Sequence, residues 1–198
     1  NLTQLPNGGI LAFIYNQPSH GRMPGDVECW ASEDGGKTWT KRSVAAPRGT
    51  PEQNRMNVAA GLTAAGNVIL VCSGWSAPGD PDAWSKIGEV LPTWVCISKD
   101  AGRTWTIKKE IFPTAPDGRH LIPFGDIMPG ADGKLRVAAY RGPVRDDEQM
   151  PEPENELARR AAEGQNWIVR GDGVSWDAPI PLSPEWADAK NAFNETAL

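Results

Sequence analysis

The sequence is poor in the features that mark several large classes of protein. Its 198 residues carry a net charge of −5 and contain no run of lysines and arginines, which argues against a nucleic-acid surface. No stretch approaches the roughly 20 apolar residues that a membrane-spanning helix needs. Neither a nucleic-acid partner nor a membrane span is therefore expected.

Cysteine is also scarce. The three residues, Cys29, Cys72 and Cys96, are odd in number and form no C-x-x-C pair, and each lies in an apolar, strand-like run. This pattern fits neither a zinc site nor a disulfide framework. We expect buried free thiols, which pack as small apolar groups.

Turn-forming and aromatic residues are abundant by contrast. The chain has 21 glycines, 18 prolines and nine tryptophans. Glycine and proline punctuate turns, so this composition favours many short strands over long helices. Helix is expected only in short insertions, at residues 153–163 and 81–87.

One eight-residue motif, which we call the box, occurs twice. The segments 32–39 and 98–105 both read S-x-D-x-G-x-T-W, and their aspartates, Asp34 and Asp100, lie 66 residues apart. A shorter copy, D-G-V-S-W, begins at Asp172, 72 residues further on. A regular repeat of strands and turns predicts a β-propeller or a β-solenoid.

A turn followed by an apolar strand precedes each box, at residues 5–13, 65–71 and 132–139. Each unit is expected to use this apolar segment as its inner strand, followed by a variable connection and a strand that enters the box. The last five residues, N-E-T-A-L, resemble the first five, N-L-T-Q-L. We therefore expect three units and the first strand of a fourth, as part of a longer domain or as half of an assembly of two copies.

The box has a mechanical interpretation. Gly36 and Gly102 allow the positive φ that a tight turn between strands needs. The aspartate can accept hydrogen bonds from the amides of its own turn, and the tryptophan can fold back as an apolar cap. The box is thus expected to be a folding device, and it indicates neither a metal site nor catalysis.

The two boxes, with the pair Asn194–Glu195 at the start of the next unit, resemble the sialidase superfamily of glycosidases and their relatives. The resemblance covers nearly the whole chain. It implies an all-β fold, with residues 1–198 forming part of a single six-bladed propeller domain: about three blades and the start of a fourth. It also implies a glycan or other carbohydrate substrate, no cofactor, and a secreted or periplasmic location.

The resemblance assigns catalytic roles to few positions. Sialidases use arginines to bind the substrate carboxylate, a tyrosine nucleophile activated by a glutamate, and an aspartate as acid/base. Glu195 lies at the position that resembles the activating glutamate. The acid/base aspartate would fall near residue 20, where the chain has His20, and Asp26 follows six residues later. Either Asp26 or His20 is expected to transfer the proton, and a histidine suits such chemistry near neutral pH.

Substrate-binding candidates cluster at the starts of the expected inner strands. Arg22 lies in the Gly/Pro-rich loop before the first box. Arg55 and Asn57 open the second inner strand, and Arg119 and His120 open the third. The inner strands of a propeller line its axial channel, so these starts are expected to face one pocket.

The leading hypothesis is a sialidase-like glycoside hydrolase acting on terminal or acidic sugars. A non-catalytic propeller that binds a glycan or a protein is an alternative, because boxes only build blades. A polysaccharide lyase with a catalytic histidine is another. Trp75 and Trp84, which lie outside the boxes, could form a carbohydrate platform or cover a blade edge.

Overall fold

A computed structural model describes most of the chain, and its regular structure is entirely β. No helix occurs among the residues that it describes. The helices predicted at 153–163 and 81–87 lie outside them. The described ranges are 1–18, 23–76, 89–116, 118–141 and 166–182.

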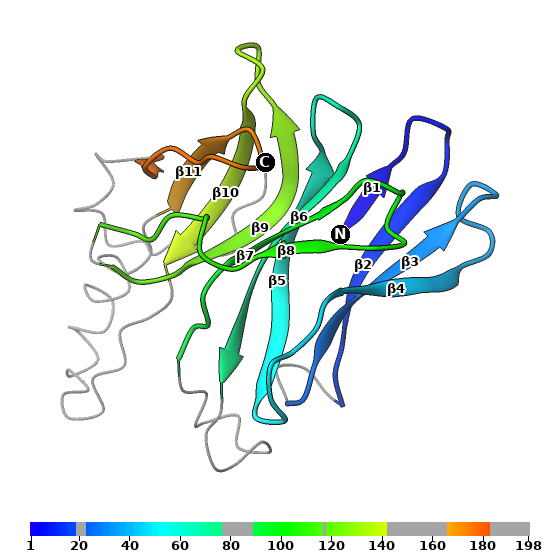
Figure 1. Ribbon diagram of the computed structural model, residues 1–198, viewed down its shortest axis with the longest axis horizontal. Helices are drawn as coiled ribbons and strands as arrows, with labels where there is room; N and C mark the ends of the chain where they lie inside the picture. Colours follow the sequence, from blue (N-terminus) through cyan, green and yellow to red (C-terminus); the bar gives the residue numbers. More distant parts are fainter. Residues whose placement is uncertain (19–22, 77–88, 117, 142–165, 183–198) are drawn as a thin grey trace, which may run out of the picture.

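The first unit is a four-stranded antiparallel sheet (Figure 1). Its strands follow the chain order: β1 (Leu2–Gln4), β2 (Ile10–Asn16), β3 (Asp26–Ser32) and β4 (Thr40–Ala46). Direct pairing of neighbours along the chain needs only hairpin connections.

The second unit forms half of an eight-stranded sheet. It comprises β5 (Gln53–Leu62), β6 (Val68–Ser76), β7 (Trp94–Ser98) and β8 (Thr106–Lys108), again antiparallel and in chain order. The long strand β5 carries a bulge between Met56 and Val58.

The third unit forms the other half of that sheet. It comprises β9 (Leu121–Pro129), β10 (Leu135–Arg141), β11 (Asn166–Gly171) and β12 (Ile180–Pro181). A short parallel pairing of β5 with β9 joins the two halves.

The three units correct one sequence-based expectation. The apolar segments at 5–13, 65–71 and 132–139 were expected to supply the inner strands, but they lead into the second strands, β2, β6 and β10. A separate first strand, β1, β5 or β9, precedes each of them. Each box then lies between the third and fourth strands of its unit, as expected for a turn.

The middle unit has an apolar core on each of its faces. Along β6, Val68, Leu70 and Cys72 belong to the core shared with the first unit, whereas Ile69 and Val71 belong to the core shared with the third. Alternate side chains of a strand point to opposite faces, and all five are buried because both faces of β6 are covered. The middle unit is thus packed between its two neighbours.

The three cysteines are free and buried, as predicted. All three belong to the core between the first and second units. Burial raises the pKa of the Cys29 thiol to about 11, so this thiol is protonated and inert at neutral pH.

The first box folds by its own hydrogen bonds, as predicted. Asp34 Oδ1 accepts the backbone amides of Lys37 and Thr38 at 3.0 and 2.9 Å, and Oδ2 accepts the Thr38 hydroxyl at 2.7 Å. Gly35 and Gly36 adopt positive φ values of 74° and 91°. The hydrogen bonds from Thr38 are the main cause that lowers the pKa of Asp34 to about 2.

The second box repeats this geometry and also docks on the preceding unit. The carbonyl oxygen of Gly102 accepts the Ser43 hydroxyl of β4 at 2.6 Å, and Trp105 Nε1 donates to the same Ser43 oxygen at 2.9 Å. The Trp105 ring meets Phe13 of β2 edge-on, with centroids 5.8 Å apart. The box therefore serves as an inter-unit joint as well as a turn.

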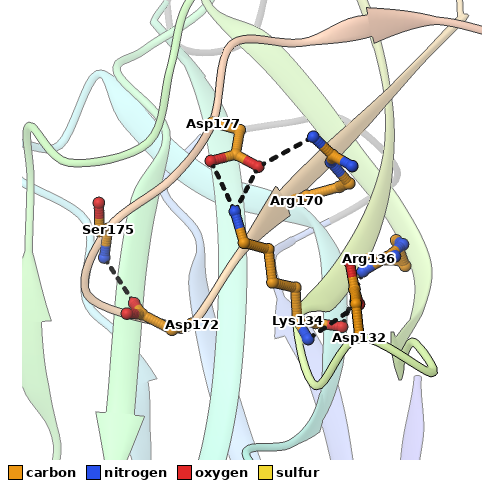
Figure 2. Close-up of polar contacts among 7 residues, drawn as sticks. All are labelled: Asp132, Lys134, Arg136, Arg170, Asp172, Ser175 and Asp177. Carbon is orange, nitrogen blue, oxygen red and sulfur yellow. Dashed lines mark hydrogen bonds and ion pairs between the residues drawn. The ribbon is translucent and has the colours of Figure 1, made fainter.

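The third box is weaker, and an ion-pair network lies beside it. Asp172 accepts only the amides of Val174 and Ser175, at 2.8 and 2.7 Å. Figure 2 shows Asp177 between Lys134 and Arg170, with contacts of 2.8 and 3.3 Å. These pairs tie the turn after β9 to the segment after the box.

Candidate functional site

Several strand ends meet at the end of the sheets opposite to the boxes (Figure 1). β5 and β9 run parallel and both begin there, β6 ends there, and β7 begins there. The start of β3 joins them through the Arg55 amide, which donates to the Gly25 carbonyl at 2.9 Å. Residues that begin these strands are therefore brought together.

Arg55, predicted as a substrate-binding residue, is a buried cation at this end. Only 3% of it is exposed, and its guanidinium carbon lies 3.5 Å from the centre of the Trp94 ring. Nη1 donates to the Pro92 carbonyl at 2.7 Å, whereas Nε is buried without an acceptor. No carboxylate of the described residues forms an ion pair with it.

Burial is the main cause that lowers the pKa of Arg55, although an arginine remains charged at neutral pH. The second cation near Trp94 is Lys109, whose Nζ lies 4.9 Å from the ring centre. Trp94 is itself buried, with 7% exposed. The indole therefore offers its electron-rich π system to two cations.

His120, also predicted, immediately precedes β9 and is partly exposed. Burial lowers its pKa, the positive charge of Arg55 lowers it further, and Glu89 opposes both effects. The imidazole is therefore neutral at neutral pH and able to accept a proton. Arg55 and Glu89 thus act on the pKa of His120 in opposite directions.

Asn57, a third predicted residue, is the extra residue of the β5 bulge. Its φ is +54°, a region that few residues other than glycine adopt. Its Oδ1 accepts the Trp75 indole N–H at 3.2 Å. The bulge thus directs the Asn57 side chain at Trp75, the last residue but one of β6.

Asp26 is held by a neighbouring arginine. Its Oδ1 accepts the backbone amide of Arg48 at 2.8 Å, and its Oδ2 accepts Arg48 Nη1 at 2.7 Å. The contact fastens the start of β3 to the segment that follows β4. Both carboxylate oxygens are thus used in a structural contact.

The remaining predicted residues are less informative. Arg119 lies next to His120, and its carbonyl accepts the Ala115 amide at 2.9 Å. His20, Arg22, Glu195 and Trp84 lie outside the described residues. Arg55, Asn57, Arg119 and His120 are therefore the predicted substrate-binding residues that the structure describes.

Comparison with known proteins shows the fold. No family model and no curated protein matches the sequence. Among solved structures, Hadza microbial sialidase Hz136 aligns with 91% of this chain at 18% identity and a TM-score of 0.64. A Trypanosoma rangeli sialidase aligns with 89% of this chain at 13% identity and a TM-score of 0.58. An ulvan lyase, which is a polysaccharide lyase, aligns with 93% of this chain at 18% identity and a TM-score of 0.55.

The chain has the all-β fold of the sialidase propellers. The chain spans less than half the length of each of these proteins: 36% of the Hadza sialidase, 29% of the Trypanosoma rangeli sialidase and 43% of the lyase. The fold is therefore one that glycan-active proteins use. Among the described residues, no helix is long and apolar enough to cross a membrane.

Proposed function

We propose that the protein is a sialidase-like glycoside hydrolase that acts on a terminal or acidic sugar of a glycan. The observation that carries this proposal is Arg55, a buried guanidinium with no carboxylate partner among the described residues and with an unsatisfied Nε. Burying a cation without an anion is unfavourable. The carboxylate of an acidic sugar would supply the missing anion, with the geometry that a guanidinium matches.

Proton transfer falls to histidine in this proposal. Asp26 already binds Arg48 with both oxygens, so His20 or His120 is the better proton donor or acceptor. Glu195 would activate the nucleophile, and Arg22 and Arg119 would contact the sugar. A secreted or periplasmic location accords with a glycan substrate.

A second candidate reaction is elimination by a polysaccharide lyase, and the positive charge of Arg55, which lowers the pKa of His120, favours it. Arg55 would neutralise the carboxylate of a uronic acid, which acidifies the hydrogen at C5. A ring nitrogen of His120 would take that proton, the electron pair would form the C4=C5 double bond, and the bond from C4 to the glycosidic oxygen would break. The departing oxygen would then take up a proton.

The test is a substrate panel offered to the complete protein. Fluorogenic sialosides and uronides report hydrolysis, and ultraviolet absorbance of uronate polysaccharides reports the unsaturated product of elimination. The variants are Arg55→Met and His120→Gln, with Arg103→Met as a matched control because Arg103 is exposed in the second box. Loss of the charged hydrogen-bonding guanidinium in the first variant, or of the proton-accepting imidazole in the second, should lower kcat/KM by roughly 10- to 100-fold.

Two outcomes would contradict the proposal. Full activity of folded Arg55→Met would remove the anion-binding role of this residue. Binding of glycans by the wild type without turnover of any substrate would indicate a non-catalytic propeller instead.

A further inference from the structure

Trp75 differs from Trp94 and Trp105 in how its ring is used. It is partly exposed, and no aromatic ring or cation of the described residues stacks on it. Trp94 by contrast is buried under Arg55, and Trp105 is packed on Phe13. The ring faces of Trp75 are therefore not committed to an aromatic or cationic neighbour in the described part of the chain.

The position of Trp75 is nevertheless fixed by its polar groups. Its backbone amide donates to Asn54 Oδ1 at 3.0 Å, and Asn54 is fully buried. Its indole N–H donates to Asn57 Oδ1 at 3.2 Å. On its other side, Trp75 forms an isolated bridge with Val90. The indole is thus held through its backbone amide and its ring N–H.

Asn57 can make its contact only because the backbone is distorted there. Met56 pairs with Ser73 and Val58 with Cys72, so Asn57 is the unpaired extra residue of the bulge. Asparagine tolerates this positive φ better than most non-glycine residues. Bulges are frequent beside active sites, where they redirect a side chain. The bulge therefore places the Asn57 side chain where its Oδ1 accepts the indole N–H of Trp75.

We propose that Trp75 is a stacking platform for a pyranose ring of the glycan, and that Asn57 is its positioning residue. The inference rests on the proposed function, because Trp75 and Arg55 belong to the same group of strand ends, where Trp75 pairs with Asn54 and Arg55 with the adjacent Gly74. A sugar ring presents C–H groups that pack on an aromatic face, whereas its hydroxyl groups need polar partners at the edge. The platform would bind the apolar face of a sugar unit, and Arg55 would bind the carboxylate of an acidic sugar through its charge.

The experiment compares glycan affinity with catalysis in the complete protein. Calorimetric titration with a sialylated trisaccharide and with a uronate oligosaccharide gives Kd, and steady-state kinetics on the same two compounds give KM and kcat. The variants are Trp75→Ala, Trp75→Phe and Asn57→Gly, since glycine permits the positive φ but lacks the oxygen. Trp39→Ala is the matched control, because Trp39 belongs to the first box and donates to Gly36.

Trp75→Ala should raise Kd and KM by roughly 10- to 30-fold, as truncation of a binding tryptophan does, with kcat changing little. Trp75→Phe should lie between the wild type and Trp75→Ala. Asn57→Gly should raise KM several-fold in the wild-type background but not when added to Trp75→Phe, because the indole N–H is then absent. Trp39→Ala should lower the melting temperature and leave Kd unchanged.

The failures of the two proposals are distinguishable. If the wild type binds and converts a glycan but Trp75→Ala keeps the same Kd, the platform is wrong and the proposed function stands. If Trp75→Ala does not fold, additive effects of Asn57→Gly and Trp75→Phe would contradict the positioning role. If the wild type binds no oligosaccharide, the proposed function fails and the platform fails with it.

Discussion

The guanidinium carbon of Arg55 lies 3.5 Å from the centre of the Trp94 ring, although β6 separates the strands that carry the two residues. Cation–π attraction and burial of the indole both stabilise this contact. The indole covers one face of the guanidinium, and the buried Nε on its edge has no hydrogen-bond acceptor among the described residues. Trp94 is thus a positioning residue for Arg55.

Replacement of Trp94 should therefore affect both stability and function. Trp94→Leu should lower the free energy of unfolding by about 2–4 kcal/mol, because it leaves a cavity and removes the cation–π contact. Trp94→Phe keeps an aromatic ring and should lower the free energy of unfolding by a smaller amount. Urea unfolding measures the stability, and kcat/KM for an acidic glycan should fall in the same order. Equal stability of both variants would show that the stacking contributes nothing.

The pKa of His120 can be read directly, because the protein has only two histidines. NMR titration, with His20→Gln to assign the signals, should give a folded-state value below 6.5. Arg55→Met should raise it, since one of the causes that lower the pKa is removed. A value that does not change would show that the two groups are not coupled.

The same shift predicts how stability and activity depend on pH. The unfolded chain has a His120 pKa near 6.5 and the folded chain a lower one, so the unfolded state takes up the proton first. The contribution of His120 to stability is present above pH 6.5 and is lost as the pH falls through the folded pKa. If neutral His120 is the base, kcat/KM should decline on the acid side with a midpoint below 6.5.

A pair of glycines tests the role of the second box as an inter-unit joint. A Cβ on Gly102 would lie 2.8 Å from Cys29 Sγ and 3.2 Å from Leu11 Cδ1, whereas one on Gly36 would meet only Trp39 at 3.8 Å. Both glycines have positive φ, so alanine at either position should cost about 1–2 kcal/mol of backbone strain. Gly102→Ala should cost roughly 1–3 kcal/mol more in urea unfolding. Equal costs would mean that the box does not dock tightly.

The first box predicts acid stability. The pKa of Asp34 is about 2 in the folded protein and near 3.8 when free, so its stabilising effect is present above pH 3.8 and is lost as the pH falls through 2. Asp34→Asn should lower the melting temperature at pH 7 and weaken its dependence on pH between 4 and 2. Thermal unfolding over this range measures both effects, and identical pH profiles would contradict the assignment.

The box could be predicted from sequence because all its interactions are local. One turn brings together Ser32, Asp34, Gly36 and Thr38, so the spacing of these residues in the sequence is enough to predict their hydrogen bonds. The docking of Trp105 on Ser43 could not be predicted in this way, since it depends on how two units pack. The apolar segments were wrongly expected to be the inner strands because the continuous apolar run lies in the second strand, such as β6, whereas β5 mixes polar residues with apolar ones.

Only part of the site could be predicted, because local sequence shows residue types beside strand starts but not the contacts between strands. Arg55 and His120 could be identified as charged or titratable residues beside expected strand starts. Trp94 was missed because P-T-W-V-C reads as the start of an ordinary apolar strand. The contact between Trp94 and Arg55 depends on the register and twist of three neighbouring strands, which a short stretch of sequence does not reveal. An unassigned tryptophan outside the boxes was the only available signal.

The central claim is that Arg55 recognises the carboxylate of an acidic sugar, and matched substrates test it most directly. Turnover by the complete protein should be measured on one acidic glycan and on its methyl ester, for the wild type and for Arg55→Met. We predict that the wild type prefers the acid by roughly 10- to 100-fold in kcat/KM and that Arg55→Met loses the preference. Equal turnover of acid and ester by the wild type would contradict the account.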